Sequence, residues 1–404
     1  MRLFRHSLVC LAILNAPFLQ AESMTDQWSV NGFGTLGVTT TNAPDMGYRT
    51  ALDTDHVVYD DLNFSSRSLI GVQSNYRWNP QWSANAQIIK KSSTDNFNEA
   101  LQLGMLIYEP SPSWRFQVGR FAPKLSMFTD NVNVNYSQLW THSPVEYYGQ
   151  YLIANSDGAE VTYTAYFDDM TLRNIFMVGH TKSQYMNQNF DPELIGDLGG
   201  YTAELTQDDW TWRASIYMLK QKADWYPSSL MNGLKSAASM GWSEANYLYD
   251  QLDVDGAQVQ VYSLGVAYAP GNWLMQAEIS KLLTNRDSML DTVSGYASVG
   301  YQINEWTPYV IYSRIHSTNE PYQLKTNPPA MFNSLAQNAV AALQTQYEQS
   351  SLGVGLRWDI NSHFSVKTQW ERVFVAAENN VLWWNDTNND RQVDAVTLNV
   401  DFIF

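Results

Sequence analysis

Apolar and polar residues alternate along many short stretches of this chain. In residues 396–404 every second side chain is apolar, and Thr397, Asn399 and Asp401 lie between the apolar positions. The same period of two recurs in residues 82–88, 210–216 and 364–370. Successive side chains of an extended segment point to opposite faces, so the pattern predicts β-strands with one apolar and one polar face.

Short polar turns join pairs of these stretches. Seven of them recur, at residues 79–81, 110–113, 167–169, 207–209, 270–272, 304–305 and 359–362. Aromatic residues flank most of the turns: Trp78, Trp82, Trp114, Trp210, Trp273, Trp306, Trp358 and Phe364. Aromatic rings prefer the interface between membrane and water, so this girdle favours a transmembrane barrel over a soluble sandwich.

Longer polar connections alternate with the seven turns. They cover approximately residues 39–65, 92–98, 122–156, 181–199, 223–256, 285–291, 318–349 and 376–391. Together the connections predict about 16 antiparallel strands, an even number that leaves both chain ends on the periplasmic side. Because backbone groups in lipid need partners, the first strand should pair with the last. The predicted fold class is therefore all-β, a transmembrane antiparallel β-barrel with short periplasmic turns and long extracellular loops.

Residues 1–21 have the pattern of a cleaved secretory signal peptide. A basic start is followed by about a dozen mostly apolar residues and then by the small residue Ala21. We expect residues 22–404 to form a single barrel domain. The one cysteine, Cys10, lies within the predicted signal peptide, and a lipoprotein alternative for Cys10 is weakened by Val9, where Gly or Ala is usual.

Composition agrees with strands as the membrane-spanning elements. No run of 18 apolar residues follows residue 21, and charged residues make up 16% of the chain, against about 25% in soluble proteins. The formal net charge is -16, and loss of the two signal-peptide arginines would make it -18. This acidity argues against a nucleic-acid partner and favours a cation-preferring lumen, although the carboxylates could instead lie in solvated loops.

Several motifs, in order along the chain, resemble those of the Gram-negative general porins. They are Val-Asn-Gly-Phe-Gly-Thr-Leu-Gly at 30–37, Arg-Ser-Leu-Ile-Gly-Val-Gln at 67–73, Trp-Arg-Phe-Gln-Val-Gly-Arg at 114–120 ahead of Pro123, and the terminal Phe404. The resemblance implies a homotrimeric barrel of sixteen strands in the outer membrane, in contact with lipid and lipopolysaccharide. It further implies a cofactor-free, water-filled channel for passive diffusion of small hydrophilic solutes, with a third loop that folds into the lumen.

The third long loop, from Ala122 to Ser156, is too long for a simple connector. By the resemblance it forms the pore constriction, for which the candidate residues are Asp130, Glu146, Trp140, Tyr147 and Tyr148. The carboxylates would repel anions. The aromatic rings either anchor the loop to the barrel wall or offer sugars and aromatic solutes a binding track, which would make the channel substrate-selective.

Strand alternation also predicts which charged side chains face the lumen. A charged group on the lipid face costs about 2–4 kcal/mol at the membrane midplane, so an inward direction is expected. The predicted pore-lining charges are Arg67, Arg213, Arg357, Lys367 and Glu371. Arg120 breaks the alternation, because of either a bulge or a position where its strand leaves the membrane.

Other function classes have weaker support in the sequence. The histidines outside the signal peptide are scattered, and no Gly-x-Ser-x-Gly nucleophile motif occurs near them, so we do not expect an enzyme. Asp386, Asn388 and Asp390 have the spacing of a calcium loop, but the glycine and the final acidic ligand are missing, which favours a solvated loop and no metal. A barrel whose loops serve adhesion or phage binding is compatible with the same pattern.

Overall fold

A computed structural model describes residues 27–54, 56–93, 100–184, 193–376, 380–384 and 391–404. The predicted signal peptide and the calcium-like residues Asp386, Asn388 and Asp390 lie outside this described part. No helix within it is long and apolar enough to cross a membrane.

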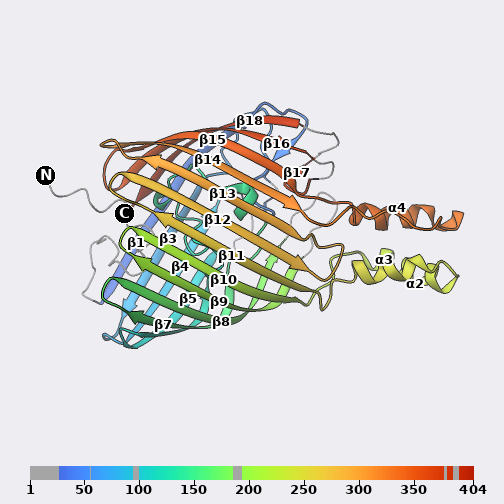
Figure 1. Ribbon diagram of the computed structural model, residues 1–404, viewed down its shortest axis with the longest axis horizontal. Coiled ribbons are helices and arrows are strands. Elements are labelled where there is room, and N and C mark those ends of the chain that lie inside the picture. The colour runs from blue at the N-terminus through green and yellow to red at the C-terminus, as the bar shows by residue number, and fades with distance from the viewer. Residues whose placement is uncertain (1–26, 55, 94–99, 185–192, 377–379, 385–390) are drawn as a thin grey trace.

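The strands close into one antiparallel barrel of 16 strands (Figure 1). They are β1 (Trp28–Thr41), β3 (Leu69–Arg77), β4 (Trp82–Lys91), β5 (Leu101–Ser111), β6 (Trp114–Phe121), β7 (Ser156–Tyr166), β8 (Met170–Gln184), β9 (Glu193–Gln207), β10 (Trp210–Gln221), β11 (Gln258–Tyr268), β12 (Trp273–Thr284), β13 (Thr292–Tyr301), β14 (Trp306–Ser317), β15 (Glu348–Asp359), β16 (Phe364–Val375) and β18 (Arg391–Ile403). The first strand pairs with the last, Phe33 opposite Ile403, which confirms the predicted closure.

All seven predicted turns join consecutive barrel strands at one end, and we call this end periplasmic. The expected loop at 181–199 is wrong in its bounds, because β8 continues to Gln184 and β9 begins at Glu193. Lys182, Ser183 and Gln184 at the end of β8 and Glu193 at the start of β9 are polar, so the sequence pattern does not distinguish these strand ends from a loop. Two further short strands, β2 (Gly47–Tyr48) and β17 (Trp383–Trp384), pair with each other and join the first long loop to the last.

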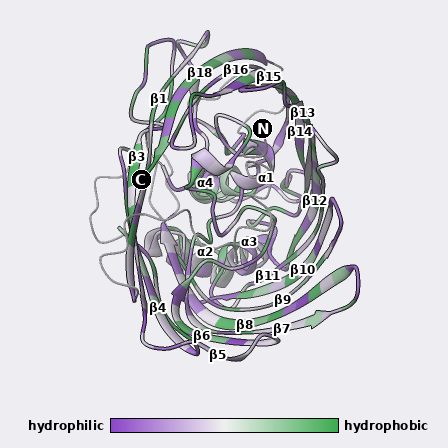
Figure 2. Cartoon of the chain, turned by 90° about the vertical axis from the view of Figure 1, so that its left-hand side faces the viewer, coloured by the Kyte–Doolittle hydropathy of each residue, from purple (hydrophilic) through white to green (hydrophobic). Residues whose placement is uncertain are grey.

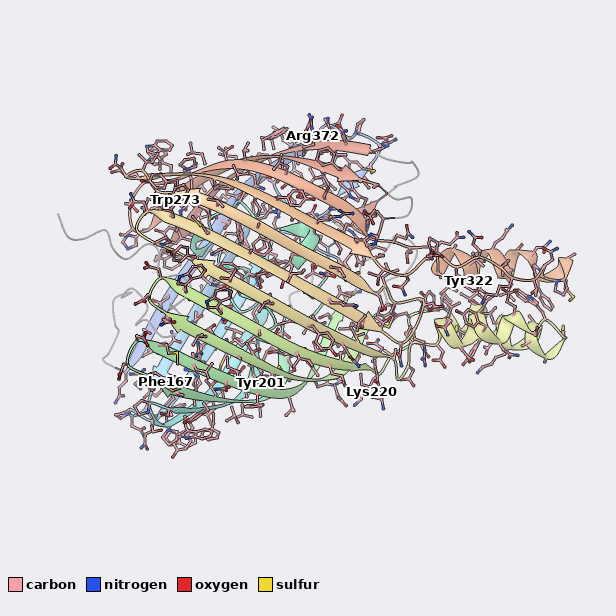
Figure 3. The ribbon with its side chains drawn as sticks, viewed as in Figure 1. Phe167, Tyr201, Lys220, Trp273, Tyr322 and Arg372 are labelled. Carbon is pink, nitrogen blue, oxygen red and sulfur yellow. The ribbon has the colours of Figure 1, made fainter. Side chains whose placement is uncertain are left out.

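Outward-facing aromatic rings form pairs at the periplasmic end. Trp210 stacks on Tyr268 with ring centroids 3.9 Å apart, and Trp306 stacks on Trp358 at 5.0 Å. Figure 3 shows Trp273 at the same end. These rings lie on adjacent strands, so cross-strand register brings them together into the girdle that the sequence predicted.

The long loops contain helices that the alternation pattern did not predict. The third loop carries η3 (Asn135–Ser137) and α1 (Val145–Tyr148), and Figure 2 places α1 within the ring of strands. The loop after β10 forms α2 (Ser228–Ser239) and α3 (Glu244–Leu252), and the loop after β14 forms η4 (Ala330–Phe332) and α4 (Asn333–Ala342). Helices α2, α3 and α4 bury a shared apolar cluster and project beyond the extracellular end (Figure 1).

Candidate functional site: the lumen and its third loop

The third loop, residues 122–155 between β6 and β7, follows the inner wall of the barrel. Near its start, Thr202 of β9 donates a hydrogen bond to the carbonyl of Lys124 (2.9 Å), and Ser215 of β10 donates one to the carbonyl of Leu125 (2.5 Å). Farther along, Asn399 of β18 donates to the carbonyl of Thr141 (2.6 Å). The loop therefore crosses the lumen side of the wall from β9 to β18, which confirms the predicted inward fold.

The aromatic residues of this loop face the wall. Trp140 is fully buried and donates a 2.7 Å hydrogen bond from Nε1 to Oγ of Ser298 on β13. The hydroxyl of Tyr147, also fully buried, lies 2.7 Å from Oγ of Ser263, and the Tyr148 hydroxyl donates to Glu278 on β12. Rings that are buried and bonded to the wall fit the anchoring alternative better than the solute track.

The two candidate carboxylates of the loop are buried as well. Asp130 accepts a 2.7 Å hydrogen bond from Nζ of Lys124. Burial opposes ionisation, but the charges of Lys124 and Arg213 dominate and lower the pKa of Asp130. Glu146, on α1, accepts hydrogen bonds from Ser313 and Gln349. Its pKa is raised, chiefly by burial and then by the neighbouring negative charge of Glu371.

Three of the predicted pore-lining cations hold the loop backbone in place. Lys367 donates to the carbonyls of Asn135 (2.5 Å) and Trp140 (3.1 Å). Arg357 donates to the carbonyls of Tyr136 and Gln138, both at 2.8 Å, and Arg213 donates to the carbonyl of Ser126 at 2.5 Å. All three point inward, as the alternation predicts, and all three bind the third loop rather than open lumen.

Carboxylates on the strands pair with the same cations. Glu204 lies 2.5 Å from Nη2 of Arg213 and 3.0 Å from Nη1 of Arg173, while Asp401 lies 3.1 Å from Nζ of Lys367. Each of these pairs links two neighbouring strands. Most of the charge on this part of the wall is therefore neutralised locally.

The other two predicted charges, Arg67 and Glu371, lie where the first long loop enters the barrel. Tyr48 of β2 donates a 2.6 Å hydrogen bond to Oε1 of Glu371, and Nε2 of His142 lies 3.4 Å from its Oε2. Arg67 is buried close to both Tyr48 and Glu371. The first, third and last loops thus meet at this point inside the extracellular half of the barrel.

Glu160 on β7 is an inward-facing carboxylate that the sequence did not single out. It is 3% exposed, and its Oε2 has no hydrogen-bond partner among the described atoms. Alternation in β7 could have found it, because Glu160, Thr162 and Thr164 occupy the buried positions of that strand. On the nearby wall, Arg115 of β6 lies 3.1 Å from Glu109 of β5.

Arg120 lies on the outer surface near the extracellular end of β6. Its guanidinium forms two hydrogen bonds with the carboxylate of Asp157, at 2.8 and 2.7 Å. It is the next-to-last residue of the strand, so of the two alternatives the structure supports the exit from the membrane. The adjacent Gly119 has a φ of 127°, a conformation that only glycine adopts readily.

Four described histidines each contact a different partner. His142 lies beside Glu371, His180 beside Asp197 and His316 beside Glu348, while His363 lies 3.0 Å from the hydroxyl of Ser362. The backbone amide of His56 donates a 3.2 Å hydrogen bond to Oγ1 of Thr54. Within the described residues no group of three or more His, Cys, Asp or Glu side chains could hold a metal ion.

Comparisons with known proteins bear on the fold. No family model and no curated protein sequence matches the chain. Among solved structures, an anion-selective porin from Comamonas acidovorans aligns with a TM-score of 0.55 at 10% identity, over 94% of this chain and 100% of that one. Salmonella typhi OmpF, solved with daunomycin, gives 0.54 at 11% identity, over 93% and 97%.

A third similar structure is OmpT, an outer membrane protein of Vibrio cholerae. It aligns with a TM-score of 0.53 at 11% identity, over 94% of this chain and 99% of that one. At such low identity the likeness concerns backbone architecture. The chain therefore has the closed barrel fold of outer-membrane porins.

Proposed function

We propose that this chain forms a water-filled channel for passive diffusion of small hydrophilic solutes across a Gram-negative outer membrane. The observation that carries the proposal is a closed sixteen-stranded barrel with an inward-folded third loop held by buried polar contacts. The anion-selective porin among the similar structures supports a channel. With the channel we also infer a non-enzymatic role for the chain.

The channel should prefer cations, although weakly. The inward-facing Asp401 and Glu204 are matched by basic partners, whereas Glu160 and Glu278 take part in none of the ion pairs formed by the described residues. Glu278 instead accepts hydrogen bonds from tyrosines and from the backbone of Met127. Glu278 is thus covered by the third loop, whereas Glu160 keeps an unpartnered carboxylate oxygen on the inner wall, and a carboxylate there leaves a residual negative potential. The fold alone does not set the sign, because one of the similar structures is anion-selective.

Reversal potentials under a salt gradient test this proposal. Purified protein is inserted into planar bilayers, and the wild type is compared with Glu160→Gln. A unit charge about 8 Å from a passing ion contributes roughly 0.5 kcal/mol in water, favourable for a cation and unfavourable for an anion, so Glu160→Gln should lower the cation-to-anion permeability ratio about fivefold. The matched control is Glu305→Gln, which removes an exposed carboxylate from a periplasmic turn.

The outcomes separate the channel from its selectivity. Ohmic current with equal reversal potentials for both variants would retain the channel and reject Glu160 as a source of cation preference. Absence of current from correctly folded protein would reject the channel itself. The alternative is a channel that selects sugars or aromatic solutes through the rings of the third loop. Trp140 and Tyr147 give it no support, because they are buried against the wall.

We further infer a homotrimer embedded in outer-membrane lipid and lipopolysaccharide. The support is the resemblance to general porins and an outer barrel surface rich in exposed apolar residues, such as Val178, Leu264 and Ile279. Such a surface needs lipid or a neighbouring subunit as its contact. Native mass measurement of the detergent-extracted protein tests the stoichiometry, and a monomeric mass would contradict the trimer.

A further inference from the structure

The inner wall of β9–β12 changes character along the barrel axis. Toward the periplasmic end, inward side chains are charged or polar, for example Glu204, Arg213 and Ser263. Toward the extracellular end, the inward positions become apolar: Leu194, Leu198, Tyr217, Leu219, Val259 and Val261. A water-filled barrel has a polar interior, so this apolar band calls for a separate explanation.

The apolar band borders a cavity of about 720 Å³ at the extracellular mouth. Its walls come from three directions: the inner faces of β9–β12, the end of the third loop at Tyr151–Ile153, and the bases of α2 and α4. Trp225 and Leu230 contribute from the α2 side, and Leu335 and Ala341 contribute from α4. The volume lies within the range of about 300–1,000 Å³ that is typical of small-molecule sites.

Four polar residues of the cavity lining, Gln150, Thr284, Ser288 and Thr292, are committed to internal hydrogen bonds. Thr292 donates to Oε1 of Gln150 (2.7 Å), whose amide nitrogen donates to Ser294. Thr284 donates to the carbonyl of Met289 (2.8 Å), and Ser288 donates to the carbonyl of Gln251 (2.5 Å). None of the residues that line the cavity is charged. Water there would find few partners, which favours occupation by an apolar molecule.

We propose that this mouth cavity binds uncharged, mainly apolar small molecules, with aromatic or branched aliphatic groups. Dispersion contacts and removal of apolar surface from water would supply the affinity. A charged solute would lose its hydration without gaining an ion-pair partner from the lining, and a sugar would lose hydroxyl hydrogen bonds. The site goes beyond the proposed channel function, because binding at the mouth can be measured whether or not the barrel conducts.

Binding of a neutral fluorescent probe tests the proposal. The full chain is reconstituted in lipid nanodiscs and titrated with N-phenyl-1-naphthylamine, whose emission rises in apolar surroundings. Empty nanodiscs supply the background, since partition into lipid is linear in probe concentration, whereas a site saturates. We expect saturable binding of about one probe per chain, displaced by naphthalene and unaffected by glucose.

Two variants and a matched control place the site. Ala341→Trp inserts an indole from α4 into the cavity and should weaken binding about tenfold or more. Val261→Thr keeps the side-chain shape but replaces a methyl group with a hydroxyl, and should weaken binding severalfold. Gln337→Trp puts the same indole on an exposed position of α4 outside the cavity and should bind like the wild type.

The circular dichroism of each variant confirms a folded barrel before titration. Saturable binding lost only in the cavity variants would establish the site. Absence of saturable binding by the wild type, equal affinity of Ala341→Trp and Gln337→Trp, or displacement by glucose would each overturn the proposal. The bilayer current of the same preparation reports separately on the channel.

Discussion

Removal of the Lys367 ammonium should loosen the third loop and destabilise the barrel. Lys367 and Asp401 are both fully buried, and Nζ lies 3.1 Å from Oδ2 of Asp401. The same ammonium donates to two third-loop carbonyls, those of Asn135 and Trp140. Lys367→Met keeps most of the side-chain volume while leaving a buried carboxylate and two carbonyls without their cation.

The magnitude follows from this geometry. At 3.1 Å and an effective dielectric constant of about 20, two unit charges attract by roughly 5 kcal/mol. Removing one partner of a buried ion pair costs about 3–5 kcal/mol, because the remaining charge stays desolvated. We therefore expect Lys367→Met to lower the free energy of unfolding by about 3–5 kcal/mol.

Urea titration in lipid vesicles, followed by tryptophan fluorescence, measures this loss. Asp401→Asn combined with Lys367→Met removes the unpaired charge, so the double variant should recover part of the stability that Lys367→Met loses. Arg372→Met is the control, since its partner Asp394 is about a quarter exposed and such surface pairs contribute about 0–1 kcal/mol. A loss below about 1 kcal/mol for Lys367→Met, or a double variant no more stable than Lys367→Met, would refute the argument.

Two further predictions concern the chain end and the projecting helices. Deletion of Phe404 should slow membrane insertion and barrel closure, because its backbone exchanges two hydrogen bonds with Gly32, at 2.8 and 2.9 Å; insertion at the wild-type rate would contradict this. Glu244 accepts hydrogen bonds from Tyr322 and Thr326, which outweigh partial burial and lower its pKa. That stabilisation should be complete above the ordinary carboxyl pKa of 4.5 and lost as pH falls through the lowered value. The protection of the α3 amides against hydrogen exchange, relative to the intrinsic rate at each pH, should therefore fall at low pH, and Glu244→Gln should show the lower protection already at pH 7.

Local pattern was sufficient for the barrel itself. Alternation of apolar and polar residues defines which face of each strand meets lipid, and the aromatic-flanked turns mark the periplasmic ends of the strands that they join. Closure then follows from the need to pair every backbone group in the membrane. For this reason the seven turns and the pairing of β1 with β18 could be predicted from sequence alone.

The helical projection could not be predicted in the same way. Helices α2 and α3 belong to one loop and α4 belongs to another, and strands β11 to β14, residues 258–317, lie between the two loops in the sequence. The three helices stabilise one another. Leu234 and Leu248 from one loop pack with Ala336 from the other in a shared cluster. Short helices gain most of their stability from such packing rather than from local propensity, so sequence pattern alone gave them no signal strong enough.

In the candidate site, too, the sequence predicts one part and only the tertiary structure decides the other. The sequence by itself determined that Arg213, Arg357 and Lys367 face inward, because the period of a strand decides the direction of each side chain. Only the tertiary structure decided that these cations bind the third loop, that Trp140 and Tyr147 lie against the wall, and that an apolar cavity occupies the mouth. Those outcomes depend on contacts between residues 87 or more positions apart, which the course of the loop across the barrel brings together and which no local pattern encodes.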